Sequence, residues 1–166
     1  MAVGVRLNPP PPRGPGLYVL LILLEEPVEV GARTFRGTVP PGLYAYVGSA
    51  GGPGGLRARI ARHLRRRKRV WWHVDWLTTS PASRVVAVAY CASGTHGPHA
   101  EAQVASCLAS RGYLPVRGFG STDDPEAESH LYKTPPGRGA AEAARDALRC
   151  LSSTVGGRCS QLSLAR

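Results

Sequence analysis

Two tyrosines, one arginine and one histidine have side chains that could take part in chemistry, and each lies in a short, distinctive context. Tyr18 lies in Gly-Leu-Tyr, Tyr46 lies in Tyr-Val-Gly, and Arg59 precedes His63 by four residues. A phenol or an imidazole can exchange protons with a substrate, and a guanidinium neutralises negative charge that grows during a reaction. Together they would suit acid–base chemistry on an anionic substrate.

The segment after Tyr46 predicts how these groups meet. Six of the eight residues 48–55 are Gly or Pro, which predicts a loop. Leu56, Ile60 and Leu64 then form one apolar stripe of a helix that we expect to run to about residue 67. At about 100° per residue, Arg59 and His63 lie on one flank of this stripe, where the helix should meet a sheet.

The charge of the chain is concentrated next to that stripe. There are 21 Lys and Arg residues against 11 Asp and Glu, a formal net charge of +10, and eight of the cations lie in residues 57–69. This excess predicts a polyanionic partner, and nucleic acid is favoured over a membrane because the helix has no second apolar face. The alternative is a merely solvated helix face. The residues that we predict to bind nucleic acid are Arg57, Arg62, Arg65, Arg66, Arg67, Lys68, Arg69 and Trp72.

Membrane-spanning and secreted proteins are excluded by the remaining features of the sequence. The longest apolar run, residues 17–24, has eight residues, and about 20 are needed to span a bilayer. The start of the chain shows no pattern of a secretory signal. The four cysteines, at positions 91, 107, 150 and 159, form no CxxC pair, and we interpret them as free thiols in a reducing cytoplasm. We therefore expect a soluble cytoplasmic protein without a membrane partner.

The length of 166 residues suits one domain. We predict a flexible leader over residues 1–15, a folded domain over 16–151 and a frayed tail over 152–166. Strands are predicted at 17–24 (buried on both faces), 28–36, 43–47 and 83–90, with short edge strands near 119 and 130–133. Helices are predicted at 56–67, 99–111 and 140–151, with a short helix or turn at 71–77. The fold class is α/β (α+β), with a small mixed or antiparallel sheet flanked by helices.

Several of these segments, taken in order, resemble the GIY-YIG nuclease superfamily. The resemblance runs from residue 16 to residue 132 and rests on Gly16-Leu17-Tyr18, Tyr46-Val47-Gly48-Ser49-Ala50, Arg59-x3-His63, Trp72-His73-Val74-Asp75-Trp76-Leu77, Gly118-Phe119-Gly120-Ser121 and Ser129-His130-Leu131. The similarity is to an uncharacterised branch that is common in archaea and thermophiles and is sometimes fused to an endonuclease III glycosylase.

The resemblance implies a metal-dependent endonuclease that hydrolyses phosphodiester bonds, in DNA rather than RNA. It implies catalytic roles for Tyr18, Tyr46 and Arg59, with His63 beside the arginine, and it makes Glu101 the ligand of Mg²⁺ or Mn²⁺. His73 resembles a family histidine near the active site, and we predict a catalytic role for it as well. The alternative is a nucleic-acid-binding module that kept the scaffold and has little or no activity.

Three further residue types are open to more than one interpretation. Asp75 is predicted to orient an Arg or a His rather than to bind metal. The tryptophans at 71, 72 and 76 could stack on unpaired bases or belong to the core. His130 is predicted to pack near the end of the sheet, not to act as a ligand.

Overall fold

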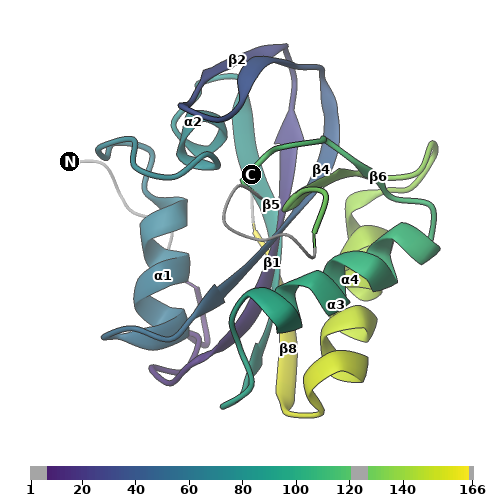
Figure 1. Ribbon diagram of the computed structural model, residues 1–166. Coiled ribbons are helices and arrows are strands. Elements are labelled where there is room, and N and C mark those ends of the chain that lie inside the picture. The colour runs from purple at the N-terminus through teal and green to yellow at the C-terminus, as the bar shows by residue number, and fades with distance from the viewer. Residues whose placement is uncertain (1–6, 121–126, 165–166) are drawn as a thin grey trace.

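Six of the eight strands that the structure describes form one sheet, with helices on both of its faces (Figure 1). The computed structural model describes residues 7–120 and 127–164. The strands are β1 (Gly16–Leu24), β2 (Val28–Gly31), β3 (Arg36–Val39), β4 (Gly42–Ala50), β5 (Ser83–Ala92), β6 (Leu114–Pro115), β7 (Leu131–Lys133) and β8 (Arg158–Ser163). The helices are α1 (Gly55–Leu64), α2 (Asp75–Thr78), α3 (Pro98–Ser110) and α4 (Ala140–Val155).

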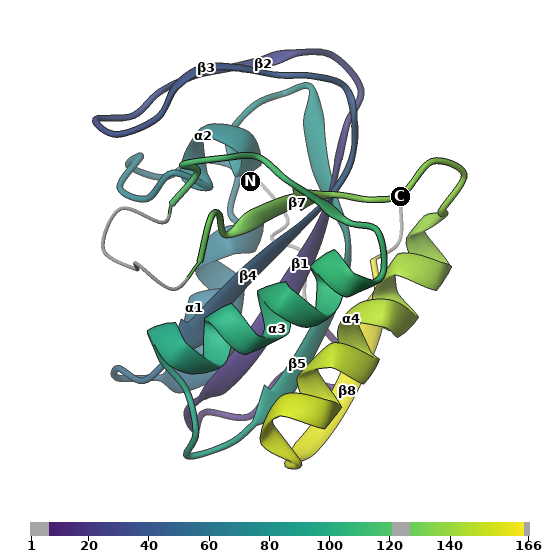
Figure 2. The same cartoon turned by 45° about the vertical axis from the view of Figure 1, so that its right-hand side comes forward.

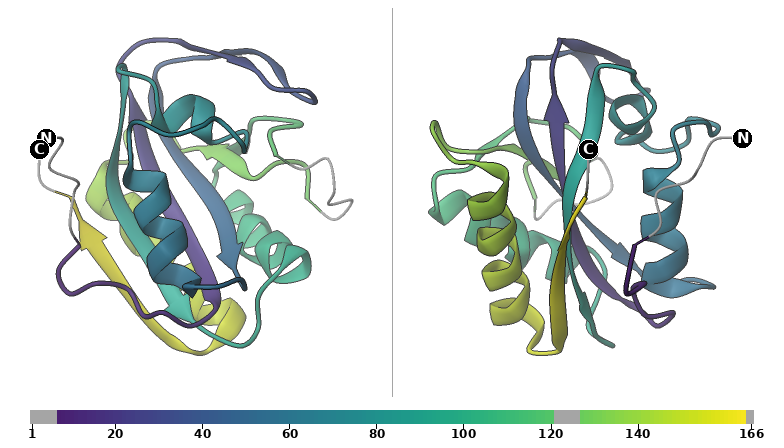
Figure 3. Two further views of the ribbon diagram at one scale, coloured as in Figure 1. Left: turned by 90° about the vertical axis from the view of Figure 1, so that its left-hand side faces the viewer. Right: turned by 180° about the vertical axis from the view of Figure 1, so that it is seen from behind.

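The sheet has the strand order β6-β7-β4-β1-β5-β8, and its paired strands are antiparallel. Helices α1 and α2 cover one face, and α3 and α4 cover the other (Figure 3, right). The hairpin of β2 and β3 forms a separate two-stranded sheet that packs beside α2 (Figure 2). The predicted fold class, a single small α+β domain, is confirmed.

Strand β1 lies at the centre of the sheet, between β4 and β5. Because side chains alternate along a strand, its apolar run serves both faces. Leu17, Val19 and Leu21 pack against α3 and α4, whereas Tyr18, Leu20 and Ile22 pack on the side of α1 and α2. The predicted strand at 17–24, buried on both faces, is therefore confirmed.

The end of β4 and the length of α1 differ from the prediction. Strand β4 continues through Gly48–Ala50, because these residues pair with Gly16–Tyr18 of β1, so the loop is shorter than residues 48–55. Helix α1 stops at Leu64 instead of residue 67, because Arg65 has an extended backbone.

The described part of the expected leader, residues 7–15, is mostly exposed but contacts the start of α1 through its backbone. The first N–H groups of a helix have no partner within the helix. Here the Leu56 N–H donates to Gly14 O (2.9 Å) and the Arg57 N–H donates to Pro12 O (3.0 Å). A Cβ atom on Gly55 would lie 2.0 Å from Arg13 O, so a glycine at this position is what admits the segment. The leader thus caps α1.

The expected frayed tail contains regular structure as far as it is described. Helix α4 continues to Val155 and ends at Gly156, which has the left-handed backbone (φ 60°) typical of a helix terminus. Residues 158–163 then form β8, which pairs with β5 at the edge of the sheet. The sequence pattern missed this strand because its residues are mostly polar or half-exposed.

The interpretation of the cysteines as free thiols is wrong. Cys91 of β5 is bonded to Cys159 of β8, its partner in the strand register, and Cys107 of α3 is bonded to Cys150 of α4. The two bridges remove the argument from free thiols for a reducing compartment. Within residues 7–120 and 127–164, the helices all lack the length and apolar character needed to cross a membrane.

Candidate active site

A small pocket opens at the edge of β4, where its pairing with β7 ends. Strand β7 pairs with Tyr44–Tyr46, and one more backbone hydrogen bond joins the Val47 N–H to His130 O (2.9 Å). Past this point, side chains from both faces of the sheet can reach the same space. The pocket has a volume of about 130 Å³ and is lined by Tyr18, Tyr46, Gly48, Ser49, Arg59, His63, Trp72, Glu101, Gly120 and His130.

The structure brings together most of the residues that the sequence singled out for chemistry. Those lining the pocket are Tyr18 (β1), Tyr46 (β4), Arg59 and His63 (α1), and Glu101 (first turn of α3). His73 does not line it. Its Nε2 lies 2.7 Å from Thr34 Oγ1, and its ring packs against Phe119 with centroids 5.7 Å apart.

Tyr18 and His63 form a buried pair at the bottom of the pocket. The Tyr18 Oη lies 2.7 Å from His63 Nε2, and His63 is 1% exposed. Burial, with a smaller effect of the nearby Lys68 ammonium, lowers the pKa of His63 to about 3. Burial, and then the neighbouring Tyr46, raises the pKa of Tyr18 well above its usual value. Both groups are therefore neutral at pH 7, and they share one proton across this contact.

The fit of Tyr18 depends on Gly48, its direct partner in the β1–β4 register. A Cβ atom on Gly48 would lie 2.4 Å from Tyr18 Oη. We expect Gly48→Ala to displace the phenol and to lower the free energy of unfolding by about 1–3 kcal/mol, the usual cost of overpacking. Gly52→Ala is the matched control, because a Cβ atom there meets nothing within 4 Å. Urea denaturation of both variants checks this, and equal stabilities would contradict it.

The neutral state of His63 predicts a pH dependence of stability. Its folded pKa of about 3 lies below the usual 6.5, so below pH 6.5 the unfolded chain binds a proton that the folded chain does not. The neutral His63 therefore does not reduce the free energy of unfolding above pH 6.5. Below that pH the free energy of unfolding falls as the pH drops toward 3, by up to about 1.4 kcal/mol per pH unit. We expect His63→Gln to flatten the profile between about pH 6.5 and 4.5, measured by urea denaturation. If the profiles of the wild type and of His63→Gln run parallel over this range, the lowered pKa of His63 is contradicted.

Glu101 reaches the pocket from the opposite face of the sheet. Its Oε1 accepts a hydrogen bond from Ser49 Oγ (2.5 Å), and its Oε2 lies 3.5 Å from His130 Nδ1. Ser49 and His130 were missed as site residues by the sequence analysis. Ser49 directly follows the Tyr-Val-Gly motif, which was the available signal. His130 packs at the end of the sheet as expected, but it also faces the carboxylate.

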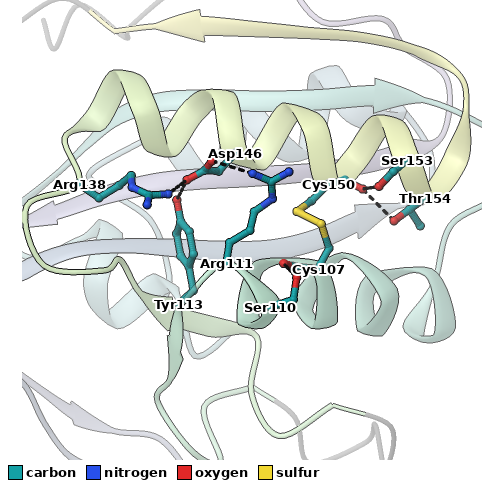
Figure 4. Close-up of a disulfide and its surroundings, with 9 residues drawn as sticks. All are labelled: Cys107, Ser110, Arg111, Tyr113, Arg138, Asp146, Cys150, Ser153 and Thr154. Atoms are coloured by element: carbon teal, nitrogen blue, oxygen red, sulfur yellow. Dashed lines mark hydrogen bonds and ion pairs between the residues drawn. A yellow bond between two sulfur atoms is a disulfide. The ribbon is translucent and has the colours of Figure 1, made fainter.

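Helix α3, which carries Glu101, is fixed to α4 by two connections (Figure 4). One is the Cys107–Cys150 disulfide. The other is the buried carboxylate of Asp146 in α4, which accepts hydrogen bonds from the Tyr113 hydroxyl (2.8 Å) and from the guanidinium groups of Arg111 and Arg138. These contacts hold the end of α3 that lies away from the pocket, and they make its first turn a defined platform for Glu101.

Arg59 is positioned by the strand end and by Trp72. Its Nη1 donates to Ser49 O (3.4 Å), and its guanidinium carbon lies 4.5 Å from the centre of the Trp72 ring. The Arg62 guanidinium lies 4.2 Å from the same ring. Trp72 therefore supports two cations. Trp76, like Trp72, is partly buried and packs against the core, whereas Trp71 is 71% exposed.

Asp75 organises the segment between α1 and α2, in agreement with its predicted role as an orienting group. It is completely buried, and its two oxygens accept hydrogen bonds from both terminal nitrogens of Arg62 and from the N–H groups of Trp71 and Trp72. Burial alone would raise the pKa of Asp75, but these hydrogen bonds outweigh it and hold the pKa below its usual value.

Several cations predicted to bind nucleic acid instead make internal contacts. Lys68 donates to the carbonyls of Arg62 and His63 at the end of α1, and its side chain is only 5% exposed. Arg66 donates to Ser80 O and Ser83 O, and Arg57 donates to Pro11 O. Arg62 is paired with Asp75. Arg65, Arg66, Arg67 and Arg69 are the exposed cations of this segment, and of these only Arg66 is held by the carbonyl contacts just named.

The donor atoms of the pocket are suited to a hard divalent cation. Glu101 supplies a carboxylate, and the Ser49 hydroxyl lies beside it. Mg²⁺ prefers oxygen ligands, usually keeps several waters and is commonly held by one or two carboxylates. No cluster of three or more His, Cys, Asp or Glu side chains able to hold a metal occurs within the described ranges. Glu101 would therefore hold such an ion with help from water and substrate oxygens.

Comparison with known proteins identifies a family without assigning an activity. No curated protein and no solved structure matches the chain. Residues 17–153 match the family described as "Domain of unknown function DUF123", and this range includes every residue that lines the pocket. Since the match covers most of the chain, the protein belongs to the DUF123 family.

Proposed function

We propose that this protein is a metal-dependent endonuclease that hydrolyses phosphodiester bonds in DNA. The observation that carries the proposal is the meeting of Tyr18, Arg59 and Glu101 in one pocket of about 130 Å³. Phosphodiester hydrolysis needs a group that receives a proton from water and positive charge beside the phosphate oxygens. The pocket offers candidates for both, and the GIY-YIG resemblance of the motifs points to the same chemistry.

In this proposal Arg59 binds the phosphate. Its guanidinium lines the pocket and is held by Ser49 O and by the Trp72 ring, so little reorganisation is needed when a substrate binds. A guanidinium can donate two parallel hydrogen bonds to a phosphate, and it stays charged throughout the reaction. The negative charge that develops on the phosphate would thus meet a fixed cation.

The Tyr18–His63 pair would receive the proton of the attacking water. Tyr18 Oη accepts that proton while its own proton passes to His63 Nε2, 2.7 Å away. The water oxygen bonds to phosphorus as its proton leaves, and the bond to the departing sugar oxygen breaks. Because burial disfavours charge on both side chains, neither a phenolate nor an imidazolium would persist, so the pair would pass the proton on to the departing sugar oxygen, which leaves as a hydroxyl.

Glu101 is the residue that would hold the cation, with Ser49 and His130 fixing the orientation of its carboxylate. When bound, Mg²⁺ or Mn²⁺ would supply positive charge at the phosphate oxygens and at the leaving oxygen. The products would be a 5′-phosphate and a 3′-hydroxyl. We also propose a cytoplasmic location, in which the DNA of the cell would be within reach.

A second candidate function is a nucleic-acid-binding module with little activity. The exposed side chains of Arg65, Arg67 and Arg69 favour it, because they offer electrostatic contacts that need no catalysis. It predicts salt-dependent binding with no metal-dependent turnover.

The test uses end-labelled nicked, flapped and branched DNA with Mg²⁺ or with EDTA. We expect cleavage of at least one of these DNAs, only with the metal, and products that carry a 5′-phosphate. Binding of the whole set without cleavage would replace the proposal by the second candidate. A matched set of RNA substrates separates DNA from RNA specificity.

A further inference from the structure

A second pocket lies beside the first one, between the loop 51–54 and the outer side of α1. It has a volume of about 260 Å³ and is lined by Ala50, Gly52, Pro53, Gly55, Ala58, Arg59, Arg62 and Arg65. Arg59 lines both pockets, so a ligand that extends out of the candidate active site along this arginine would enter the second pocket. Nothing in the proposed reaction uses this space.

The charge of the second pocket favours an anion. Its three arginines are spaced by three residues along α1 and the turn after it, and no acidic side chain lines it. Arg62 is neutralised by Asp75. Within residues 7–120 and 127–164, neither Arg59 nor Arg65 forms an ion pair with a carboxylate. Two uncompensated guanidinium groups therefore face one cavity.

The other walls of the pocket are small and leave room for a phosphate. Gly52, Gly55 and Ala58 contribute almost no side-chain volume. The N–H groups at the start of α1 are already used: those of Gly55, Leu56, Arg57 and Ala58 donate to backbone carbonyls of the loop and the leader. An anion in this pocket would thus be held by arginine side chains and not by the helix terminus.

We propose that this pocket binds the phosphate next to the one that is placed against Arg59 in the active site, on the same nucleic-acid strand. The inference rests on the proposed function and adds a path for the strand to it: the strand runs between the active site and the 51–54 loop, with consecutive phosphates on either side of Arg59. Arg65 is then a binding residue specific to the second phosphate.

The experiment uses metal-free protein and three thymidine trinucleotides that compete with a labelled 12-nucleotide strand. One trimer has both phosphodiesters, and each of the other two has one of its two linkages replaced by a neutral methylphosphonate. For the wild type, we expect neutralising either linkage to weaken binding by about fivefold, the value of about one exposed ion pair. For Arg65→Ala, one of the two neutralisations should have no effect. Arg145→Ala, an exposed arginine of α4 on the other face of the sheet, is the matched control and should behave as the wild type.

The outcomes separate this inference from the proposed function. If the wild type binds the trimers and Arg65→Ala responds to both neutralisations as the wild type does, the second phosphate site is overturned and the proposed function stands. Pyrophosphate is tested as a further competitor of the labelled strand. If Arg65→Ala weakens competition by pyrophosphate but leaves competition by the trimers as in the wild type, the pocket binds a free anion and the strand assignment is overturned. If the wild type binds no oligonucleotide, the proposed function fails and the second site fails with it.

Discussion

Arg59→Ala is expected to lower the rate of DNA cleavage by about 10²- to 10³-fold, the usual cost of removing one fixed group that stabilises charge in the transition state. Arg59 lies on the wall shared by both pockets, where it can face the reacting phosphate. Arg59→Lys should recover part of this loss, because an ammonium keeps the charge but not the two-pronged geometry.

The measurement is single-turnover cleavage at saturating protein, which separates the chemical step from binding. Arg145→Ala again serves as the matched control for the loss of one positive charge, and it should cleave like the wild type. The stability of Arg59→Ala should fall only by about 0.5–1 kcal/mol, the worth of one exposed contact between a cation and an aromatic ring. Cleavage by Arg59→Ala at the wild-type rate would remove Arg59 from the mechanism.

The largest effect on stability is expected for Asp75→Ala, which should lower the free energy of unfolding by about 3–5 kcal/mol. Removing this buried carboxylate leaves the Arg62 guanidinium without its ion-pair partner and two backbone N–H groups without their acceptor. The Trp71 and Trp72 segment should then loosen, and with it the Trp72 ring that supports Arg59.

Urea denaturation of Asp75→Ala, beside the exposed acid variant Glu29→Ala, checks this expectation. The lowered pKa of Asp75 adds a pH dependence with a definite sign. The stabilisation by the ionised Asp75 carboxylate is fully present above the pKa of Asp75 in the unfolded chain, about 3.9, and it is lost as the pH falls through the lower pKa of the folded state. The difference in stability between the wild type and Asp75→Ala should therefore shrink in strong acid. A loss below about 1 kcal/mol at pH 7 would contradict the central structural role of Asp75.

The parts of the fold that the sequence predicts well are those with a strong apolar period. The run 17–24 is apolar at every position, and only a strand in the middle of a sheet buries both of its faces. The stripe of Leu56, Ile60 and Leu64 likewise fixes which side of α1 meets the sheet, and so places Arg59 and His63 at its flank. Neither inference needs knowledge of distant contacts.

The missed parts depend on contacts between residues far apart in the chain. Strand β8 has no apolar pattern and exists as the edge partner of β5, with Cys159 bonded to Cys91 across 68 residues. The described part of the leader meets α1 because its carbonyls accept the N–H groups at the start of that helix. Neither β8 nor the contact of the leader with α1 leaves an apolar period in the local sequence from which it could have been predicted.

The candidate site shows the same division. Tyr18, Tyr46, Arg59 and His63 lie on elements that are neighbours in the chain or in the sheet, so their meeting was predictable. Glu101 was assigned only through the resemblance. It reaches the pocket from α3 because the pairing of β7 with β4 stops before the end of β4, and the sequence does not show where that pairing stops. The internal roles of Lys68 and Arg66 were also hidden, since a run of cations does not show which carbonyls lie within reach.

The central claim is that this pocket cleaves phosphodiester bonds through a cation held by Glu101. The most direct measurement is single-turnover cleavage of the best DNA substrate by the wild type and by Glu101→Gln, with the affinity of both proteins for that DNA measured in parallel. Glutamine keeps the size of the side chain and a hydrogen-bond acceptor for Ser49, and it removes the negative charge. We predict unchanged DNA affinity and a cleavage rate that falls by at least about 10²-fold. Cleavage by Glu101→Gln at the wild-type rate, with the same dependence on Mg²⁺, would contradict the claim.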